Sequence, residues 1–302
     1  MVRTSACIVG ALLGLPILAL GQTAEEKKAT VAYLRSLQVE GKEGGFVSRP
    51  PGRDGKKEVP TLRATSAAIR ALKYFGGEMP REQAARFFVA KCRDEKSGGF
   101  RPGLDPEGKP DVYNTAVGLM AVDELKMPRD AFNPGGVKFL VENAKNFEEI
   151  RIAVAGLEAT GPGMPLQAGE WIKQLQKMQN ADGTFGKGDG AARDTGGAIV
   201  ALLRMGVKPE KPENVLKVMR AGQRKDGGFG QAGADTSDLE TTYRIMRAFH
   251  MLKAKPAEPD KVRDFIAKCR AKDGGYGVAP GQPSNVGGTY FAGIILHWLD
   301  EK

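Results

Sequence analysis

The chain has 302 residues and a formal net charge of +9 at pH 7, with 45 lysines and arginines against 36 acidic residues. A chain of this length can bury a large hydrophobic core. The basic residues are scattered among the acidic ones, with no basic block longer than Lys56-Lys57. This pattern indicates a solvated surface and excludes a basic patch for nucleic acid, while attraction to anionic lipid surfaces is compatible with it.

The first 21 residues have the pattern of an export signal. Arg3 provides a positive start, residues 6–20 form an apolar run, and Ala19-Leu20-Gly21 is a small-x-small cleavage site before Gln22. The run contains Pro16 and is shorter than the roughly 20 residues that span a bilayer. We therefore expect cleavage near Gly21, no stable transmembrane anchor, and an exported protein that is periplasmic or extracellular. A retained anchor is the alternative.

A short phrase recurs along the rest of the chain: glycine, then glycine or threonine, then an aromatic residue. Its copies are Gly44-Gly45-Phe46, Gly98-Gly99-Phe100, Gly183-Thr184-Phe185, Gly227-Gly228-Phe229 and Gly274-Gly275-Tyr276. Each is followed by a threonine at a matching place: Thr65, Thr115, Thr195, Thr242 and Thr289. A degenerate copy begins at Asn146-Phe147. Six units of roughly 40–50 residues predict a repeat architecture.

Two helices joined by the glycine turn are the expected elements of each unit. Residues 64–72, 115–122 and 195–203 are rich in small residues, as expected for inner helices that approach one another closely. In the fifth unit, residues 215–225 have amphipathic spacing, and 240–252 form the second helix.

The glycine turn itself has an expected role in that unit. Asp226-Gly227-Gly228 is expected to end the first helix with a glycine in the left-handed conformation. Phe229 is expected to pack its ring against the helix pair.

Six helical hairpins can stack as an open solenoid or close into a ring. The number six favours closure, as do terminal units that resemble the others and lack polar capping faces. The predicted fold is therefore an all-α toroid (α/α toroid), with residues 22–302 as one domain. Its inner-helix N-termini are expected to open at one end of a central funnel, where unsatisfied N–H groups and positive helix ends attract ligands.

Two cysteines remain after the expected cleavage, Cys92 and Cys269, at equivalent places in the second and sixth units. A disulfide needs Cα atoms within about 7 Å. An intervening unit separates the two, so we expect two buried, unpaired thiols.

The glycine-aromatic turns, in phase with the threonines, resemble the prenyltransferase and squalene-oxidase repeat. This repeat is shared by protein prenyltransferase β-subunits and by squalene and hopene cyclases, which have a terpenoid-cyclase-like toroid fold. The resemblance covers nearly all of residues 22–302. It implies transferase or cyclase chemistry only where the family's functional residues are present.

The family's zinc ligands are replaced in this chain. Related prenyltransferases bind zinc through Asp and Cys of a D-x-C-Y stretch and through His of an H-T-x-F/Y stretch. The matching stretches are Glu240-Thr241-Thr242-Tyr243 and Gly288-Thr289-Tyr290-Phe291. A carboxylate with a neutral hydroxyl does not hold zinc, so we expect no metal and no cofactor. The histidines, His250 and His297, fall in the last turns of their helices, away from the funnel mouth.

The family's other reactive groups are also missing. The loop at 231–239 has two aspartates and no base, although the family neutralises a diphosphate there with Arg and Lys. The D-x-D-D acid of the cyclases is reduced to Arg193-Asp194-Thr195-Gly196, with one carboxylate. The chain is moreover too short for the second toroid of a cyclase.

Carboxylates near the funnel mouth leave a second chemistry open, that of polysaccharide lyases and hydrolases on similar toroids. Asp238 with Glu240, Asp194 and Asp111 could supply the acids. The alternative is that these aspartates cap inner helices, because Asp194 directly precedes Thr195 and Asp111 lies four residues before Thr115.

Tyrosines near the starts of inner helices complete the expected mouth, either as an aromatic rim or as packing between helices. Arg63 is the one base placed there to meet an anion. The candidate ligand-binding residues are Glu240, Asp238, Thr242, Tyr243, Tyr290, Tyr113, Asp194 and Arg63.

We expect a binding module that has lost the family's zinc and diphosphate chemistry. Its funnel would take an apolar ligand such as a lipid or isoprenoid, a peptide, or a protein partner. The alternatives are a prenyltransferase with a rearranged site and a carboxylate-dependent polysaccharide lyase or hydrolase. Whether the protein is an enzyme is left open, and the substituted motifs argue against it.

Overall fold

The computed structural model describes residues 22–41, 44–51, 58–161 and 163–301. The expected signal, residues 1–21, lies outside the described residues. In the described part the chain forms an outer and an inner set of α-helices. The outer helices are α1 (Ala24–Ser36), α3 (Glu82–Cys92), α5 (Arg129–Asn143), α7 (Ala168–Lys177), α9 (Pro212–Ala221) and α11 (Pro259–Lys268). The inner helices are α2 (Leu62–Phe75), α4 (Val112–Glu124), α6 (Phe147–Ala159), α8 (Ala191–Arg204), α10 (Leu239–Met251) and α12 (Val286–Asp300).

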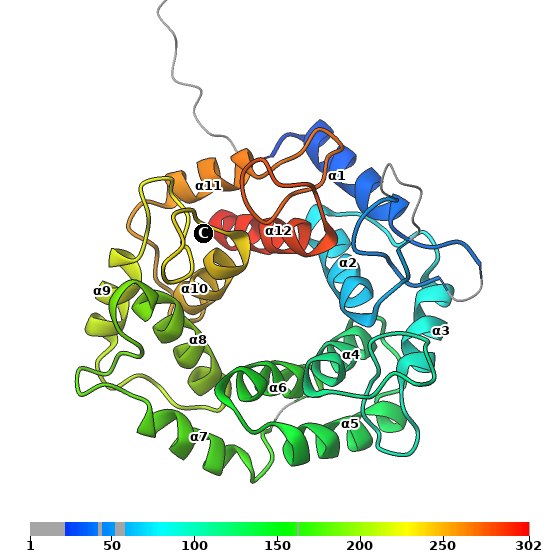
Figure 1. Cartoon of the computed structure of the whole chain (residues 1–302), viewed down its shortest axis with the longest axis horizontal. Coiled ribbons are helices and arrows are strands. Elements are labelled where there is room, and N and C mark those ends of the chain that lie inside the picture. The colour runs from blue at the N-terminus through cyan, green and yellow to red at the C-terminus, as the bar shows by residue number, and fades with distance from the viewer. Residues whose placement is uncertain (1–21, 42–43, 52–57, 162, 302) are drawn as a thin grey trace, which may run out of the picture.

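The two sets form concentric rings, with the even-numbered helices inside and the odd-numbered ones outside (Figure 1). Each inner helix contacts the next, and α12 contacts α2, which closes the circle. The predicted α/α toroid is therefore confirmed. The degenerate third unit keeps its helix pair, α5 and α6. No helix in the described ranges is long and apolar enough to cross a lipid bilayer.

Hydrogen bonds between loops place the starts of neighbouring inner helices at the same end of the ring. The first N–H of α2, at Leu62, donates to the carbonyl of Pro102 in the loop before α4, at 2.8 Å. The first N–H of α12, at Val286, donates to Ser48 before α2, at 2.9 Å. Because these bonds link the entrances of adjacent inner helices, the residues of their first turns face one common mouth.

The repeated threonine holds the repeated aromatic residue. In all five copies the threonine Oγ1 accepts a hydrogen bond from the aromatic residue's backbone N–H, at 2.9–3.0 Å. The five threonines are fully buried, and the aromatic side chains are at most 3 % exposed. A buried N–H without a partner is costly, so this bond fixes each turn against its inner helix.

The first glycine of the phrase joins one unit to the next. Gly227 has φ +97°, and a Cβ there would lie 2.0 Å from the carbonyl oxygen of Lys261 on α11. Gly274, with φ +89°, likewise packs on Ala29 of α1. The expectation that Gly227 ends the preceding helix is wrong, because α9 already ends at Ala221 with a right-handed cap at Gly222. The glycine is needed for close contact with the neighbouring helix and for its left-handed backbone.

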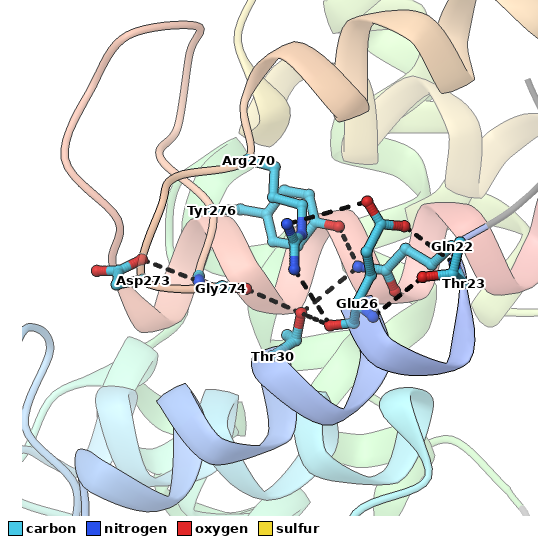
Figure 2. Close-up of polar contacts among 9 residues, drawn as sticks. Gln22, Thr23, Glu26, Thr30, Arg270, Asp273, Gly274 and Tyr276 are labelled. Carbon is cyan, nitrogen blue, oxygen red and sulfur yellow. Dashed lines mark hydrogen bonds and ion pairs between the residues drawn. The ribbon is translucent and has the colours of Figure 1, made fainter. Parts of the chain in front are cut away.

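Figure 2 shows the same joint between the last glycine turn and α1, the first outer helix. The Thr30 hydroxyl donates to the Gly274 carbonyl at 2.8 Å. Arg270 donates to the backbone carbonyl of Glu26 at 3.3 Å, and the side chain of Gln22 bonds the Tyr276 hydroxyl. The first outer helix is thereby fixed to the last glycine turn.

Cys92 and Cys269 are buried free thiols, as predicted. Burial raises the pKa of each thiol to about 12. Both are therefore protonated packing residues near neutral pH.

The threonine bond gives a direct test. Thr242→Val keeps the side-chain shape and leaves the buried N–H of Phe229 without a partner, so we expect the free energy of unfolding to fall by about 1–3 kcal/mol. Chemical denaturation measures it. Thr236→Val, at an exposed loop position, is the matched control. Equal effects of the two changes would contradict this role.

Candidate functional site

A central cavity of about 870 Å³ lies inside the inner ring. All six inner helices contribute to its lining, α8 only through Arg204 at its last position. The volume is in the range of small-molecule sites. The character of the walls therefore decides what the cavity can hold.

The mouth of the cavity carries a charged cluster. Arg244, which is 8 % exposed, donates to Glu148 of α6 at 2.8 Å and to Glu240 at 3.0 Å. Arg151 also pairs with Glu148, at 3.0 Å. Burial favours the neutral form of Glu148, but Arg244 and Arg151 outweigh it and hold its pKa below the usual range. These arginines therefore keep Glu148 ionised.

Deeper in the cavity, three arginines from different helices surround Tyr243 of α10. Arg247 donates to the Tyr243 hydroxyl at 3.2 Å, and Arg70 of α2 donates to the Tyr290 hydroxyl at 3.0 Å. Arg204 is 6 % exposed and pairs with Glu158 at 2.9 Å. Within the described ranges, neither Arg70 nor Arg247 pairs with a carboxylate. Positive charge therefore exceeds negative charge at this point.

This charge favours the ionised form of both tyrosines, but the net shifts of their pKa values have opposite signs. Burial raises the pKa of Tyr243, but Arg247, Arg204 and Arg70 outweigh it and lower the pKa well below its usual range. Burial, reinforced by Tyr243, outweighs Arg70 and Arg247 and raises the pKa of Tyr290. Tyr243 is therefore the group of the two that ionises first.

The opposite wall carries an apolar patch between charged residues. Val117 and Met120 of α4 and Ile152 and Ala155 of α6 line it at middle depth. Aromatic rings cover the cationic side: Tyr243 and Phe291 lie 4.9 Å apart between ring centroids, and the Arg70 guanidinium lies 4.3 Å from the Tyr290 centroid. The cavity therefore has an apolar patch on one wall and arginines and tyrosines on the other.

The candidate residues divide into two groups. Those that line the cavity are Arg63, Tyr113, Glu240, Tyr243 and Tyr290. Those that do not are Asp194, Asp238 and Thr242. The Thr242 hydroxyl is committed to Phe229 and to the Asp238 carbonyl, and the Asp238 carboxylate caps α10 by accepting from the Thr241 N–H at 2.7 Å.

The capping alternative holds for two of the three aspartates. Asp111 caps α4 as Asp238 caps α10. Asp194 is not a cap, because a 3-10 turn (η1, Gly188–Gly190) starts the helix earlier and Gly190 takes the N-cap position. Asp194 instead lies in the first turn of α8, where a carboxylate favourably meets the positive helix end.

Sequence reasoning missed most of the charged lining: Arg70, Asp123, Glu124, Glu148, Arg151, Glu158, Arg204, Arg244 and Arg247. A signal was available. Glu240, Tyr243, Arg244 and Arg247 recur at helical spacing on α10, and such spacing places residues on one helix face. A charged stripe on an inner helix must face the cavity, because the remaining sides pack against neighbours.

The described ranges contain no group of three or more His, Cys, Asp or Glu side chains placed to hold a metal ion. His250 and His297 both contact Glu301, at 3.3 and 3.0 Å, and lie in the last turns of their helices.

A family model described as the prenyltransferase alpha-alpha toroid domain matches residues 5–85, 76–151 and 153–302. No curated protein matches the sequence.

Several solved structures share the fold at low identity. A glycosidase variant in complex with glucose aligns at 12% identity and a TM-score of 0.61, covering 91% of this chain and 96% of that one. The type II terpene cyclase MstE from Scytonema, with geranylgeranyl dihydroxybenzoate as substrate, aligns at 11% and 0.58, covering 91% and 96%. A polysaccharide lyase aligns at 12% and 0.59, covering 93% of this chain and 53% of that one. Similarity at this level concerns the fold alone.

The two acids at the start of α10 should differ in stability effect. Asp238→Ala removes a helix cap, so we expect the free energy of unfolding to fall by about 1 kcal/mol. Glu240→Ala should cost less, because Glu240 is 48% exposed and Arg244 keeps its bond to Glu148. Urea denaturation of both variants measures the difference. A larger loss for Glu240→Ala would contradict the assignment.

The arginine cluster predicts an early tyrosine ionisation. As pH rises from neutral, one tyrosinate should form well before the others, because three guanidinium groups stabilise the Tyr243 phenolate. Near-ultraviolet absorbance follows this step, which Tyr243→Phe should remove. Tyr113→Phe is the control, since burial raises the pKa of Tyr113. An early step that survives Tyr243→Phe would rule out this origin.

Proposed function

Because the chain belongs to the prenyltransferase alpha-alpha toroid family, we propose that its central cavity binds a small amphipathic organic molecule. The apolar body of the ligand lies against α4 and α6, and its polar end faces α2, α10 and α12. The observation that carries this proposal is that one cavity holds an apolar patch on α4 and α6 and, across from it, a group of arginines and tyrosines.

Local packing supports binding over zinc-dependent transfer. The Thr242 oxygen, at the family's cysteine position, already bonds the N–H of Phe229 and the carbonyl of Asp238. At the family's histidine position, a Cβ on Gly288 would lie 2.6 Å from the Tyr276 carbonyl oxygen. This position therefore has no room for a side chain unless the turn moves.

The lining also argues against a purely apolar ligand, because a hydrocarbon would leave several buried charges without solvent or a partner. Two-carboxylate glycoside hydrolysis is less favoured as well. That reaction needs one carboxyl group with a raised pKa as its acid, whereas the pKa of Glu148 is lowered and Glu240 shares the same arginine. An amphipathic molecule matches both walls.

Calorimetry with farnesol, a branched chain with one hydroxyl, tests the proposal. We expect one molecule to bind per chain. Ala155→Phe should abolish binding because the new ring fills the cavity from α6. Ala90→Phe, on the exposed side of α3, should leave it intact. Binding that Ala155→Phe does not weaken would place the ligand elsewhere and contradict the proposal.

A further inference from the structure

We propose that Arg70, Arg204 and Arg247 form an oxyanion site that receives a carboxylate group of the ligand, and that the Tyr243 oxygen supplies the opposing charge when the site is empty. This inference rests on the proposed function and specifies its ligand as a carboxylate-bearing amphipathic molecule.

The first support is the bonding of the arginines themselves. Arg204 has its carboxylate, Glu158, whereas Arg70 bonds only a backbone carbonyl and the Tyr290 hydroxyl. The buried Nε of Arg247 has no hydrogen-bond partner among the described residues. A buried guanidinium without a carboxylate partner is costly, and an anion in the cavity would supply that partner. Arginine is also the side chain best shaped to bind carboxylate oxygens.

Charged and titratable groups from all six inner helices lie around Tyr243. The charged and titratable groups that line this part of the cavity are Arg70 and Tyr74 of α2, Asp123 and Glu124 of α4, Glu158 of α6, Arg204 of α8, Arg247 of α10 and Tyr290 of α12. The acids are engaged: Asp123 pairs with Arg129, Glu124 with Lys73 at 3.0 Å, and Glu158 with Arg204. No carboxylate of this lining is therefore left to balance Arg70 and Arg247.

A nearby histidine does not supply the balance. Burial and Arg247 lower the pKa of His250 against the opposing effect of Glu301. His250 is therefore neutral as Tyr243 ionises. The lowered pKa of Tyr243 agrees with its role as the internal anion.

A carboxylate exchanges for the Tyr243 phenolate one charge for one. When this monoanion enters and Tyr243 takes up one proton from solvent, the net charge of the site is unchanged. Binding therefore consumes one proton in the pH range where Tyr243 is ionised. Above the pKa of Tyr243, the affinity should fall by about tenfold per pH unit.

The experiment compares farnesoic acid with farnesol, which have matched carbon chains, by calorimetry on the full protein. Near neutral pH, the acid should bind roughly 10–100-fold more tightly than the alcohol, as expected for hydrogen bonds to a charged group. Buffers of different ionisation enthalpy count the protons taken up. Arg70→Met and Arg247→Met should each remove the preference for the acid, and Arg220→Met, at an exposed position on α9, should not.

Tyr243→Phe separates the two parts of the inference. We expect this variant to keep the preference for the acid and to lose proton uptake and the fall in affinity at high pH. Equal binding of acid and alcohol by the wild type would overturn the oxyanion site and leave the proposed function standing. Binding of neither molecule would overturn both. A preference for the acid without proton uptake would overturn the role of Tyr243.

Discussion

The toroid depends on one hydrogen bond, made five times, between a buried threonine hydroxyl and the N–H of the aromatic residue in the glycine turn. This bond fixes the turn to its own inner helix, and the preceding glycine fixes the same turn to the next outer helix. Together the two contacts set the position of each unit relative to its neighbour. Small deviations would add up around a ring, so closure requires every joint to have nearly the same geometry.

This joint explains why the two faces of each inner helix carry different kinds of residue. Residues that face the outer helices and the turns are small, apolar or threonine, because they must pack closely. Residues that face the axis have no packing partner and can carry charge. Arg70, Arg244 and Arg247 occupy such positions. Their charges are balanced unevenly, with two carboxylates around Arg244 and none beside Arg247, and this difference separates the mouth from the deeper site.

The repeated phrase was enough to predict the architecture, since spacing, number of units and turn chemistry all agreed. The same phrase did not predict which residues line the cavity. Thr242 was placed at the mouth because it matches a family ligand position, yet it belongs to the structural joint. Arg204 and Arg247 were not predicted, because they lie in later turns of α8 and α10, whereas the predicted ligand-binding residues all lie near the N-termini of inner helices. Arg204 and Arg247 lie on neighbouring inner helices, α8 and α10, and the packing of these two helices brings both charges to Tyr243.

Closure of the ring also constrains how the chain can fold. Helix α2 packs against α4 on one side and against α12 on the other, so one of its faces stays without a partner until almost the whole chain has been synthesised. Contacts between such distant segments form late and slowly. In the finished ring no inner helix is left as an end from which unfolding could begin, unlike in an open solenoid. A closed toroid therefore combines a slow last step of assembly with resistance to fraying once that step is complete.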